Sequence, residues 1–202
     1  MTELRGVIKA RGIRFSGPFL FVTFIIMALG RKFFERSTLW VAKSILGKKL
    51  VRIYRGRRVE GIITETEAYV GPEDRASHAS RGKTKRTEAM FGEAGTVYVY
   101  LIYGMHYCLN IVTDKKEYPA AVLIRGIGVD GKLINGPGRV CRFMRVDKTL
   151  NKKPLSQKSG IWIAAPSGRA LPRLKIVAGK RIGVDYAGKK WAGKPWRFFI
   201  KV

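Results

Sequence analysis

The segment from residue 97 to residue 112 constrains the fold more than any other part of the chain. Valine, isoleucine and tyrosine are frequent in it, and these residues favour strands because they pack well on a pleated surface. Tyr103-Gly104 interrupts the segment near its middle, where glycine can adopt the positive φ that a tight reversal needs. The segment therefore predicts an antiparallel hairpin whose tip lies near Tyr103.

Short strand-like runs recur along the rest of the chain, without long helical periods or internal repeats. At 202 residues the chain is long enough to bury the core of one domain. We expect a mixed α/β fold of the α+β type: a single domain with a curved, mainly antiparallel sheet flanked by helices, and a protruding β-hairpin. Helices are expected from Ser37 to Leu46 and over about 140–146, and strands at 49–54, 59–70, 120–129, 161–165, 174–177, 182–186 and 196–202.

The charge of the chain is strongly unbalanced, with 40 Lys and Arg against 14 Asp and Glu and a formal net charge of +26. Each phosphate that a basic side chain neutralises releases counterions, so an excess of this size favours a polyanionic partner such as a nucleic acid. A solvated surface kept soluble by its charge is the alternative.

The cysteine and histidine content gives little support to metal chemistry. Cys108 and Cys141 lie among apolar neighbours, so we expect buried free thiols in a reducing compartment. His78 and His106 are the two histidines of the sequence, and it contains no Cys-x-x-Cys spacing. We therefore expect no structural zinc, no other metal and no cofactor.

Residues 1–32 form an N-terminal extension of uncertain status. Their apolar run, 18–29, follows basic residues as in a signal peptide, but it is shorter than the ~20 residues of a membrane span. A core segment, or a non-native extension from an upstream start codon, would explain the run as well. We expect a cytoplasmic protein (nucleoid-associated in a prokaryote) without a membrane partner, and a membrane-anchored protein is the alternative.

Two carboxylates alternate with threonines in the strand expected at 59–70. Because side chains alternate between the faces of a strand, Glu65, Glu67 and Tyr69 should share one side. A carboxylate beside a tyrosine on the inner face of a curved sheet could hold a water molecule for attack. A solvent-facing polar edge is the alternative, and carboxylates about 7 Å apart also resemble the pairs of glycosidases.

The expected hairpin places its aromatic and apolar residues in two groups. Tyr98 and Tyr100 fall on one face of the first strand. Leu101, Tyr103 and Met105 lie near the tip, where ordinary loops avoid apolar side chains. Proteins that kink duplex DNA insert such side chains as wedges. Packing of these residues into the protein's own core is the alternative.

Three further features could contact a base or a phosphate. His78 lies in a polar segment, where it is either a structural hydrogen-bonding residue or a base contact. The turn Gly136–Gly138 precedes an expected helix and could offer backbone N–H groups to a phosphate, although glycine turns are common. Arg125, Arg139 and Arg142 could clamp phosphates or simply face solvent.

Together, these features resemble the alkyladenine (3-methyladenine) DNA glycosylase family. Several motifs carry the resemblance in the expected order, which makes chance agreement very improbable, and they imply a DNA glycosylase domain over residues 33–202. The matching segments are Glu65–Asp74 with Ala76-Ser77-His78, Met90-Phe91, Gly95–Ile111, Val122–Arg125, Asn135–Arg139 and Pro195–Phe198.

The resemblance implies a role for each candidate residue. Glu67 is expected to be the general base that deprotonates the water attacking C1′ of a flipped nucleotide. Asn110 would crowd the exocyclic amine of normal guanine, and Tyr103 would fill the gap left in the duplex. The base pocket is expected to contain Tyr69, His78, Tyr100 and Asn110, the intercalating tip Tyr103 and Met105, and the phosphate contacts Arg125, Gly138 and Arg139.

The implied activity is that of a base-excision-repair enzyme, a monofunctional DNA-3-methyladenine glycosylase. It would act, as a monomer, on double-stranded DNA containing damaged purines such as 3-methyladenine, 7-methylguanine and hypoxanthine, and leave an abasic site. No nearby lysine matches a Schiff-base nucleophile, so strand cleavage is not expected.

Two segments depart from the family pattern, the short connection 126–134 and the helix residues 142–145. They bear on lesion range and on DNA affinity rather than on Glu67. A noncatalytic nucleic-acid-binding protein is the alternative function. The complete set of Glu67, Tyr69, His78 and Asn110 favours the enzyme, because binding alone does not require it.

Overall fold

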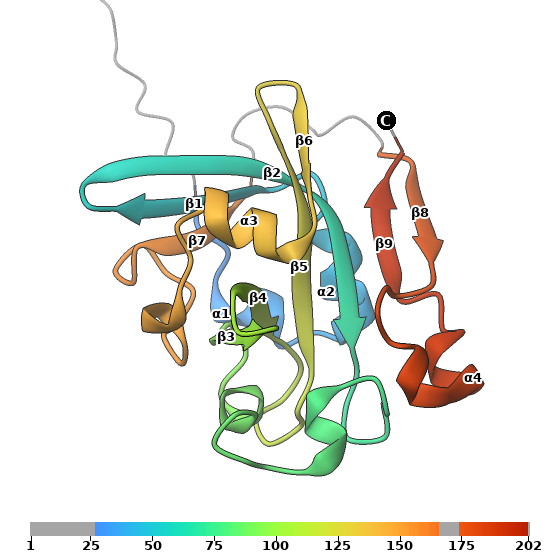
Figure 1. Cartoon of the computed structure of the whole chain (residues 1–202). Coiled ribbons are helices and arrows are strands. Elements are labelled where there is room, and N and C mark those ends of the chain that lie inside the picture. Colours follow the sequence, from blue (N-terminus) through green and yellow to red (C-terminus); the bar gives the residue numbers. More distant parts are fainter. Residues whose placement is uncertain (1–26, 166–173, 202) are drawn as a thin grey trace, which may run out of the picture.

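The computed structural model describes residues 27–165 and 174–201, and these form a domain built on one nine-stranded sheet (Figure 1). The strand order is β3-β4-β5-β2-β1-β7, with β6 paired to β5 and β9 placed between β2 and β8. The strands are β1 (Lys49–Tyr54), β2 (Arg57–Tyr69), β3 (Val97–Ile102), β4 (His106–Val112), β5 (Ala121–Val129), β6 (Lys132–Asn135), β7 (Ile161–Ala164), β8 (Ile176–Gly179) and β9 (Arg197–Ile200).

Every strand pair of the described chain is antiparallel. The expectation of a mixed α/β fold with a large, mainly antiparallel sheet is therefore confirmed. The described helices are short, and some of them pack against strands of the sheet (Figure 1). They are α1 (Arg31–Phe34), α2 (Thr38–Ser44), α3 (Pro137–Phe143) and α4 (Gly188–Ala192), with 3-10 turns at His78–Arg81, Glu88–Phe91, Lys148–Leu150 and Asp185–Ala187.

Strand β2 organises the sheet because it changes partner along its length. Its first half pairs with β1, residues 65–67 pair with β9, and β5 runs along its other edge. The register with β5 shifts between Ile63 and Thr66. A bulge of this kind bends a strand and increases its local twist, which places the Glu65–Tyr69 end of β2 in a curved part of the sheet.

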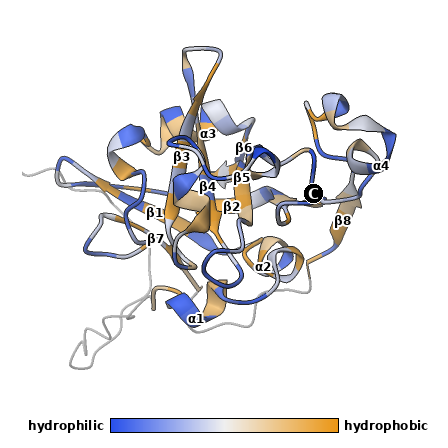
Figure 2. Cartoon of the chain, turned by 90° about the horizontal axis from the view of Figure 1, so that it is seen from below, coloured by the Kyte–Doolittle hydropathy of each residue, from blue (hydrophilic) through white to orange (hydrophobic). Residues whose placement is uncertain are grey.

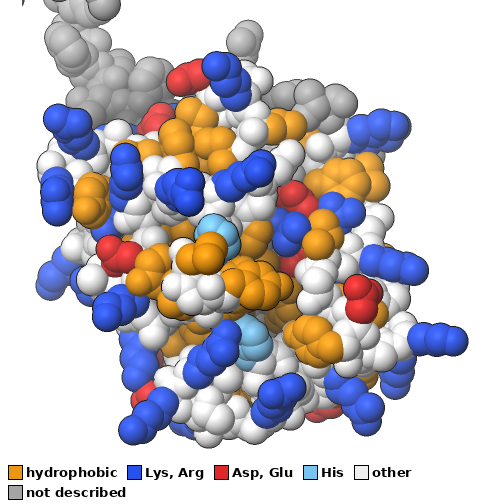
Figure 3. Space-filling model, viewed as in Figure 1, with side chains coloured by type: hydrophobic (Ala, Val, Ile, Leu, Met, Phe, Trp, Pro, Cys, Tyr) orange, Lys and Arg blue, Asp and Glu red, His pale blue; other side chains and the backbone are white. Residues whose placement is uncertain are grey.

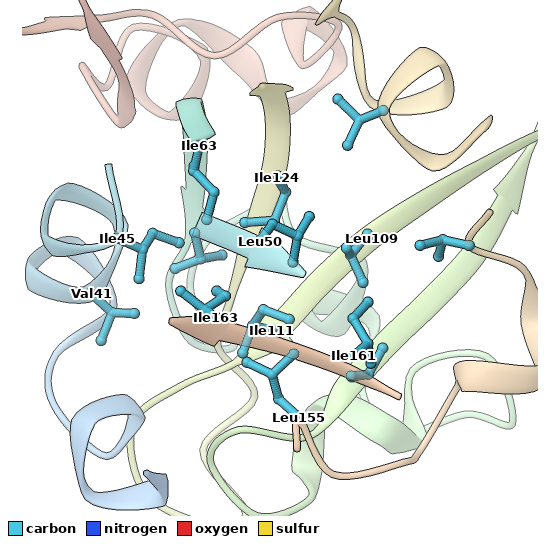
Figure 4. Close-up of a cluster of buried hydrophobic side chains, with 14 of the residues drawn as sticks. Val41, Ile45, Leu50, Ile63, Leu109, Ile111, Ile124, Leu155, Ile161 and Ile163 are labelled. Atoms are coloured by element: carbon cyan, nitrogen blue, oxygen red, sulfur yellow. The ribbon is translucent and has the colours of Figure 1, made fainter. Parts of the chain in front are cut away.

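The core collects apolar side chains from strands far apart in the sequence (Figure 4). Leu50 of β1, Ile63 of β2, Leu109 of β4 and Ile163 of β7 are fully buried in one cluster. Burying each such side chain contributes about 1.5–3 kcal/mol. Figure 2 shows the same arrangement by hydropathy, with hydrophobic residues concentrated in the strands and hydrophilic ones in the connections.

Because side chains alternate along β2, one side of this strand faces the core and the other faces away from it. The Thr66 hydroxyl donates to the Ala42 carbonyl oxygen of α2 over 2.9 Å and lies on the core side. Glu67, the next residue, therefore points to the opposite side of the sheet. A shift of β2 by one residue would turn Thr66 to that side and Glu67 to the core.

One of the expected strands near the C-terminus differs from the structure. Residues 182–186 were expected to form a strand, and this is wrong: the segment bends at Ile182 and Gly183 and ends in a 3-10 turn. Gly183 has a φ of +75°, which a regular strand does not tolerate.

Most of the apolar run 18–29 lies outside the described residues. Among those described, no helix is long and apolar enough to cross a membrane.

Gly71 lies in the turn that follows β2 and provides a test of the fold. Its φ is +70°, and a Cβ built there would lie 2.3 Å from the Tyr118 hydroxyl oxygen. We expect Gly71→Ala to lower the free energy of unfolding by about 1–3 kcal/mol, measured by urea denaturation. Gly56→Ala is the matched control, because Gly56 has a φ of +75° with open space around it. An equal loss in both variants would contradict the close approach of Tyr118.

Candidate active site

A pocket of about 520 Å³ opens on the face of the molecule that carries the β3–β4 hairpin. Figure 3 shows hydrophobic side chains gathered at the centre of this face, with Lys and Arg side chains around them. Strands β2, β3, β4 and β5 supply the lining, together with residues 76–78 and the segment 182–186. Among the lining residues are Glu67, Tyr69, His78, Tyr98, Tyr100, Asn110, Arg125 and Ile182.

Glu67 has no exposed surface, yet its carboxylate lines this pocket. Its Oε1 accepts the backbone N–H of Ile182 at 2.9 Å, and its Oε2 accepts the Tyr69 hydroxyl at 3.0 Å. Burial raises the pKa of Glu67 above its ordinary value, while Arg125 and these two hydrogen bonds act to lower it. The site thus holds a carboxylate that can take up a proton more readily than an exposed one.

Arg125 on β5 joins the two carboxylates that the alternation of β2 places on one side. Its Nε donates to Glu65 Oε1 at 3.1 Å and lies 3.6 Å from Glu67 Oε1. Arg197 of β9 donates to the same Glu65 oxygen at 3.0 Å. The structure therefore places the Arg125 guanidinium beside Glu67, and its expected contact with a phosphate stays a prediction.

Aromatic side chains form much of the pocket wall. The His78 and Tyr100 rings meet edge to face with centroids 4.6 Å apart, and Tyr98 lies 5.2 Å from Tyr100. His78 Nδ1 is 3.3 Å from the Tyr98 hydroxyl oxygen. Burial, with Arg86 and Arg81 nearby, lowers the pKa of His78 to about 4, and burial raises the pKa of Tyr98 to about 12. These groups are neutral near pH 7 and present flat rings to a ligand.

Asn110 lies on β4 with its side chain almost fully buried. Its amide nitrogen donates to the carbonyl oxygens of Tyr98 at 3.2 Å and Cys108 at 3.4 Å. These bonds fix the amide within the pocket lining. The structure thus brings Glu67, Tyr69, His78, Tyr100 and Asn110 around one cavity.

The tip of the hairpin is exposed, as a wedge requires. The Tyr103 residue is 86% exposed and Met105 is 70% exposed, so neither packs into the protein's own core. Tyr103 and Gly104 both have positive φ, and the Met105 N–H donates to the Ile102 carbonyl oxygen at 3.1 Å to close the turn. A tyrosine held in the left-handed region at a tip is uncommon and strained.

Gly138 and Arg139 lie at the start of α3, in a second hollow of about 480 Å³. This hollow shares Ile102 and Pro137 with the lining of the main pocket, so the two adjoin. A Cβ at Gly138 would lie 3.0 Å from the Cβ of His106, so the glycine lets α3 approach the hairpin closely. Arg139 is exposed beside it.

Sequence reasoning missed several residues of the site. Ile182 acts through its backbone N–H, which no side-chain pattern reveals. Tyr186 lines the pocket while its hydroxyl donates to the Ala76 carbonyl oxygen at 2.9 Å. Arg86 lies with its guanidinium carbon 5.4 Å from the Tyr100 ring centroid, and the basic loop 80–87 was the one signal that could have indicated it.

The fold and the pocket define the class: a single-domain sheet protein whose buried carboxylate faces a cavity with aromatic walls suited to a flat ring. Comparison with known proteins narrows the class. Residues 32–202 match the family described as Methylpurine-DNA glycosylase (MPG). Proteins named "Putative 3-methyladenine DNA glycosylase" are similar to the chain. That of Methanocella arvoryzae is 46% identical over 189 residues, covering 86% of this chain and 92% of that protein.

The similarity extends to other organisms. The protein of the same name from Sodalis glossinidius is 46% identical over 177 residues, which cover 84% of this chain and 95% of that protein. The one from Ehrlichia chaffeensis is 43% identical over 177 residues, with 85% and 92% covered. The chain therefore belongs to the methylpurine-DNA glycosylase family, as its motifs predict. It is a DNA glycosylase, a hydrolase acting on N-glycosyl bonds, and works in the repair of alkylation damage.

Proposed function

We propose that this enzyme flips a damaged purine out of double-stranded DNA into the aromatic pocket and hydrolyses its N-glycosidic bond with a water that Glu67 activates. The expected substrates are 3-methyladenine, 7-methylguanine and hypoxanthine, and the product is an abasic site. The observation that supports this most is the Glu67 carboxylate, buried, held by Tyr69 and Ile182, and facing the cavity beside His78 and Tyr100.

The lining of the pocket suits an everted purine in its chemistry. Extrusion of a nucleotide costs a few kcal/mol, least where pairing is already damaged, and a flipped base is recognised by stacking on aromatic side chains. Tyr69, His78 and Tyr100 supply such rings, and a methylated purine is cationic and stacks well on electron-rich rings. Asn110, which also lines the pocket, would by the family resemblance crowd the exocyclic amine of normal guanine and so disfavour the undamaged base.

The reaction then follows from the position of Glu67. As the C1′–N9 bond breaks, the electron pair leaves with the purine, and the sugar gains oxocarbenium character. The water oxygen bonds to C1′ while Glu67 accepts a water proton, and a nearby carboxylate also stabilises the positive sugar. Because 7-methylguanine is already cationic, it leaves as a neutral base, whereas neutral hypoxanthine must take up a proton to leave as one. The described residues that line the pocket include no lysine, which supports a monofunctional enzyme without a Schiff-base intermediate.

We propose that phosphates bind along α3, next to the pocket. Arg139, Arg142 and Arg145 are exposed while Val140, Cys141 and Met144 between them are buried, so the arginines form one stripe on the outer side of α3 and its end. Within the described part of the chain, none of the three forms an ion pair with a carboxylate. These cations are free to neutralise a phosphate, together with the backbone at Gly138.

Salt dependence tests this stripe. We expect Arg139→Gln combined with Arg142→Gln to reduce the slope of log K against log salt by about 0.9 for each phosphate that the arginines no longer neutralise, measured by fluorescence anisotropy on duplex DNA. Lys158→Gln is the control, because this exposed lysine precedes β7, at the other end of the strand order from the hairpin. An unchanged slope in the double variant would remove the stripe from the DNA-binding surface.

A single-turnover assay tests the proposed function as a whole. Oligonucleotide duplexes carrying one 7-methylguanine or hypoxanthine are incubated with excess enzyme, and abasic sites are revealed by alkaline cleavage. We expect base release from the damaged duplex and none from undamaged DNA. A noncatalytic binding protein would shift the same duplexes in a gel without forming abasic sites. Two further expectations have tests of their own. Gel filtration tests whether the protein is a monomer, and cell fractionation tests whether it is cytoplasmic.

A further inference from the structure

A second buried network adjoins the end of β2 that carries Glu67, and it is built on the ion pair of Asp74 and Arg181. Neither side chain has any exposed surface. The Arg181 guanidinium donates through both terminal nitrogens to the two Asp74 oxygens, Nη2 to Oδ1 at 2.9 Å. Asp74 also accepts the backbone N–H groups of Val70 and Ala76, each at 3.1 Å. Such bidentate, charge-assisted pairs fix geometry closely.

The Arg181 guanidinium is also fixed by its other neighbours. Nη1 donates to the Ala68 carbonyl oxygen at 2.9 Å, and Nη2 donates to the Trp191 carbonyl oxygen at 3.1 Å. The Tyr69 and Trp196 ring centroids lie 4.9 Å and 5.0 Å from the guanidinium carbon. One side chain thus connects the end of β2, the loop that follows it and α4.

The residue after Arg181 is Ile182, whose N–H holds Glu67 Oε1 at 2.9 Å. Ile182 belongs to no strand or helix, and half of the residue is exposed, so its own side chain does little to anchor it. Tertiary packing anchors the segment again at Val184, which is buried with Ala76 and Ala187. The position of the Ile182 N–H therefore depends on the anchor next to it, Arg181.

We propose that Arg181, clamped by Asp74, is a positioning residue that holds the Ile182 N–H against Glu67 and so keeps the general base in its reactive geometry. Arg181 is not among the residues that line the pocket. It acts through one backbone donor and through the ring of Tyr69. The inference rests on the proposed role of Glu67 as the base.

The test compares Arg181→Lys with Arg52→Lys. Arg52 is also a buried arginine that donates to carbonyl oxygens, those of Ile53 at 2.8 Å and Gly160 at 3.0 Å, but it lies on β1, away from the pocket. Lysine keeps the charge but cannot form the bidentate pair. Asp74→Asn, which keeps the side-chain size, is the second variant. It tests the positioning role of the Arg181–Asp74 pair if Arg181→Lys does not fold.

For Arg181→Lys we expect a fall in the single-turnover rate of about tenfold to a hundredfold, since small displacements of a catalytic group cost this much. Binding of a duplex with an abasic site should change little. The acid limb of the pH–rate profile should move to higher pH, because the ionised form of Glu67 loses a hydrogen-bond donor. Arg52→Lys should keep the wild-type profile.

An NMR titration gives a readout that does not require turnover. In the wild type the amide resonance of Ile182 should follow the ionisation of Glu67, and in Arg181→Lys it should lose most of that response. An inactive wild type would refute the proposed function while this titration still tests the positioning. A folded Arg181→Lys or Asp74→Asn variant whose rate, acid limb and Ile182 titration match those of the Arg52→Lys control would overturn the inference.

Discussion

Replacing Glu67 by glutamine is expected to lower the single-turnover rate of base release by about 10²–10⁴-fold, the usual contribution of a positioned general base. Glutamine keeps the size of the side chain and can still accept hydrogen bonds through its amide oxygen, so the pocket should remain assembled. What is lost is the group that takes the water proton and the negative charge that faces the developing oxocarbenium ion. Binding to a lesion duplex should stay close to that of the wild type.

The control for this experiment is Glu60→Gln. Glu60 lies on the same strand but pairs with Lys49 at 2.6 Å and Arg58 at 2.9 Å, remote from the pocket lining. We expect it to release bases at the wild-type rate. A glutamine amide cannot accept a proton from water. A Glu67→Gln enzyme that retained near-full activity would therefore show that another group activates the water.

Replacing Tyr103 by serine is expected to weaken binding to a lesion duplex by about tenfold or more, because stacking of a base on an aromatic side chain contributes about 1–3 kcal/mol. Tyr103 stands at the exposed tip of the hairpin, so the change removes the wedge and leaves the core intact. The fluorescence of 2-aminopurine at the flipped position, which increases when the base leaves the stack, should be reduced in the complex.

Ile176→Ser is the matched control for the wedge. Ile176 is a partly exposed apolar residue, 39% accessible, on β8, which pairs with β9. It should leave both affinity and 2-aminopurine fluorescence unchanged. Unchanged fluorescence with Tyr103→Ser would mean that the tip does not support the extruded nucleotide.

Much of this site could be predicted from the sequence because it is built on strands. The alternation of side chains places Glu65 and Glu67 on one side of β2, and the structure shows Arg125 within reach of both. The same rule places Tyr98 and Tyr100 together in the lining. The antiparallel hairpin and its exposed tip followed from a strand-forming run interrupted by Tyr103-Gly104, where the chain does reverse.

The parts that could not be predicted depend on contacts between distant segments. Ile182 looked like the start of a strand, but its N–H is used by Glu67, 115 positions earlier in the chain. Arg181 and Asp74 are 107 positions apart, and their pairing depends on how the loop after β2 meets the segment before α4. The sequence does not indicate which group the Arg125 side chain contacts, since an arginine on a strand can equally face a carboxylate or a phosphate.

The pH dependence of base release from a 7-methylguanine duplex tests the role of Glu67 most directly, because this cationic lesion needs no acid to depart. Under single turnover, the wild-type rate should rise with pH through one ionisation, with a midpoint above the ordinary carboxyl pKa, since burial raises the pKa of Glu67. In Glu67→Gln that ionisation should be absent. The same acid limb in both enzymes, or a wild-type rate that does not change with pH, would contradict Glu67 as the base.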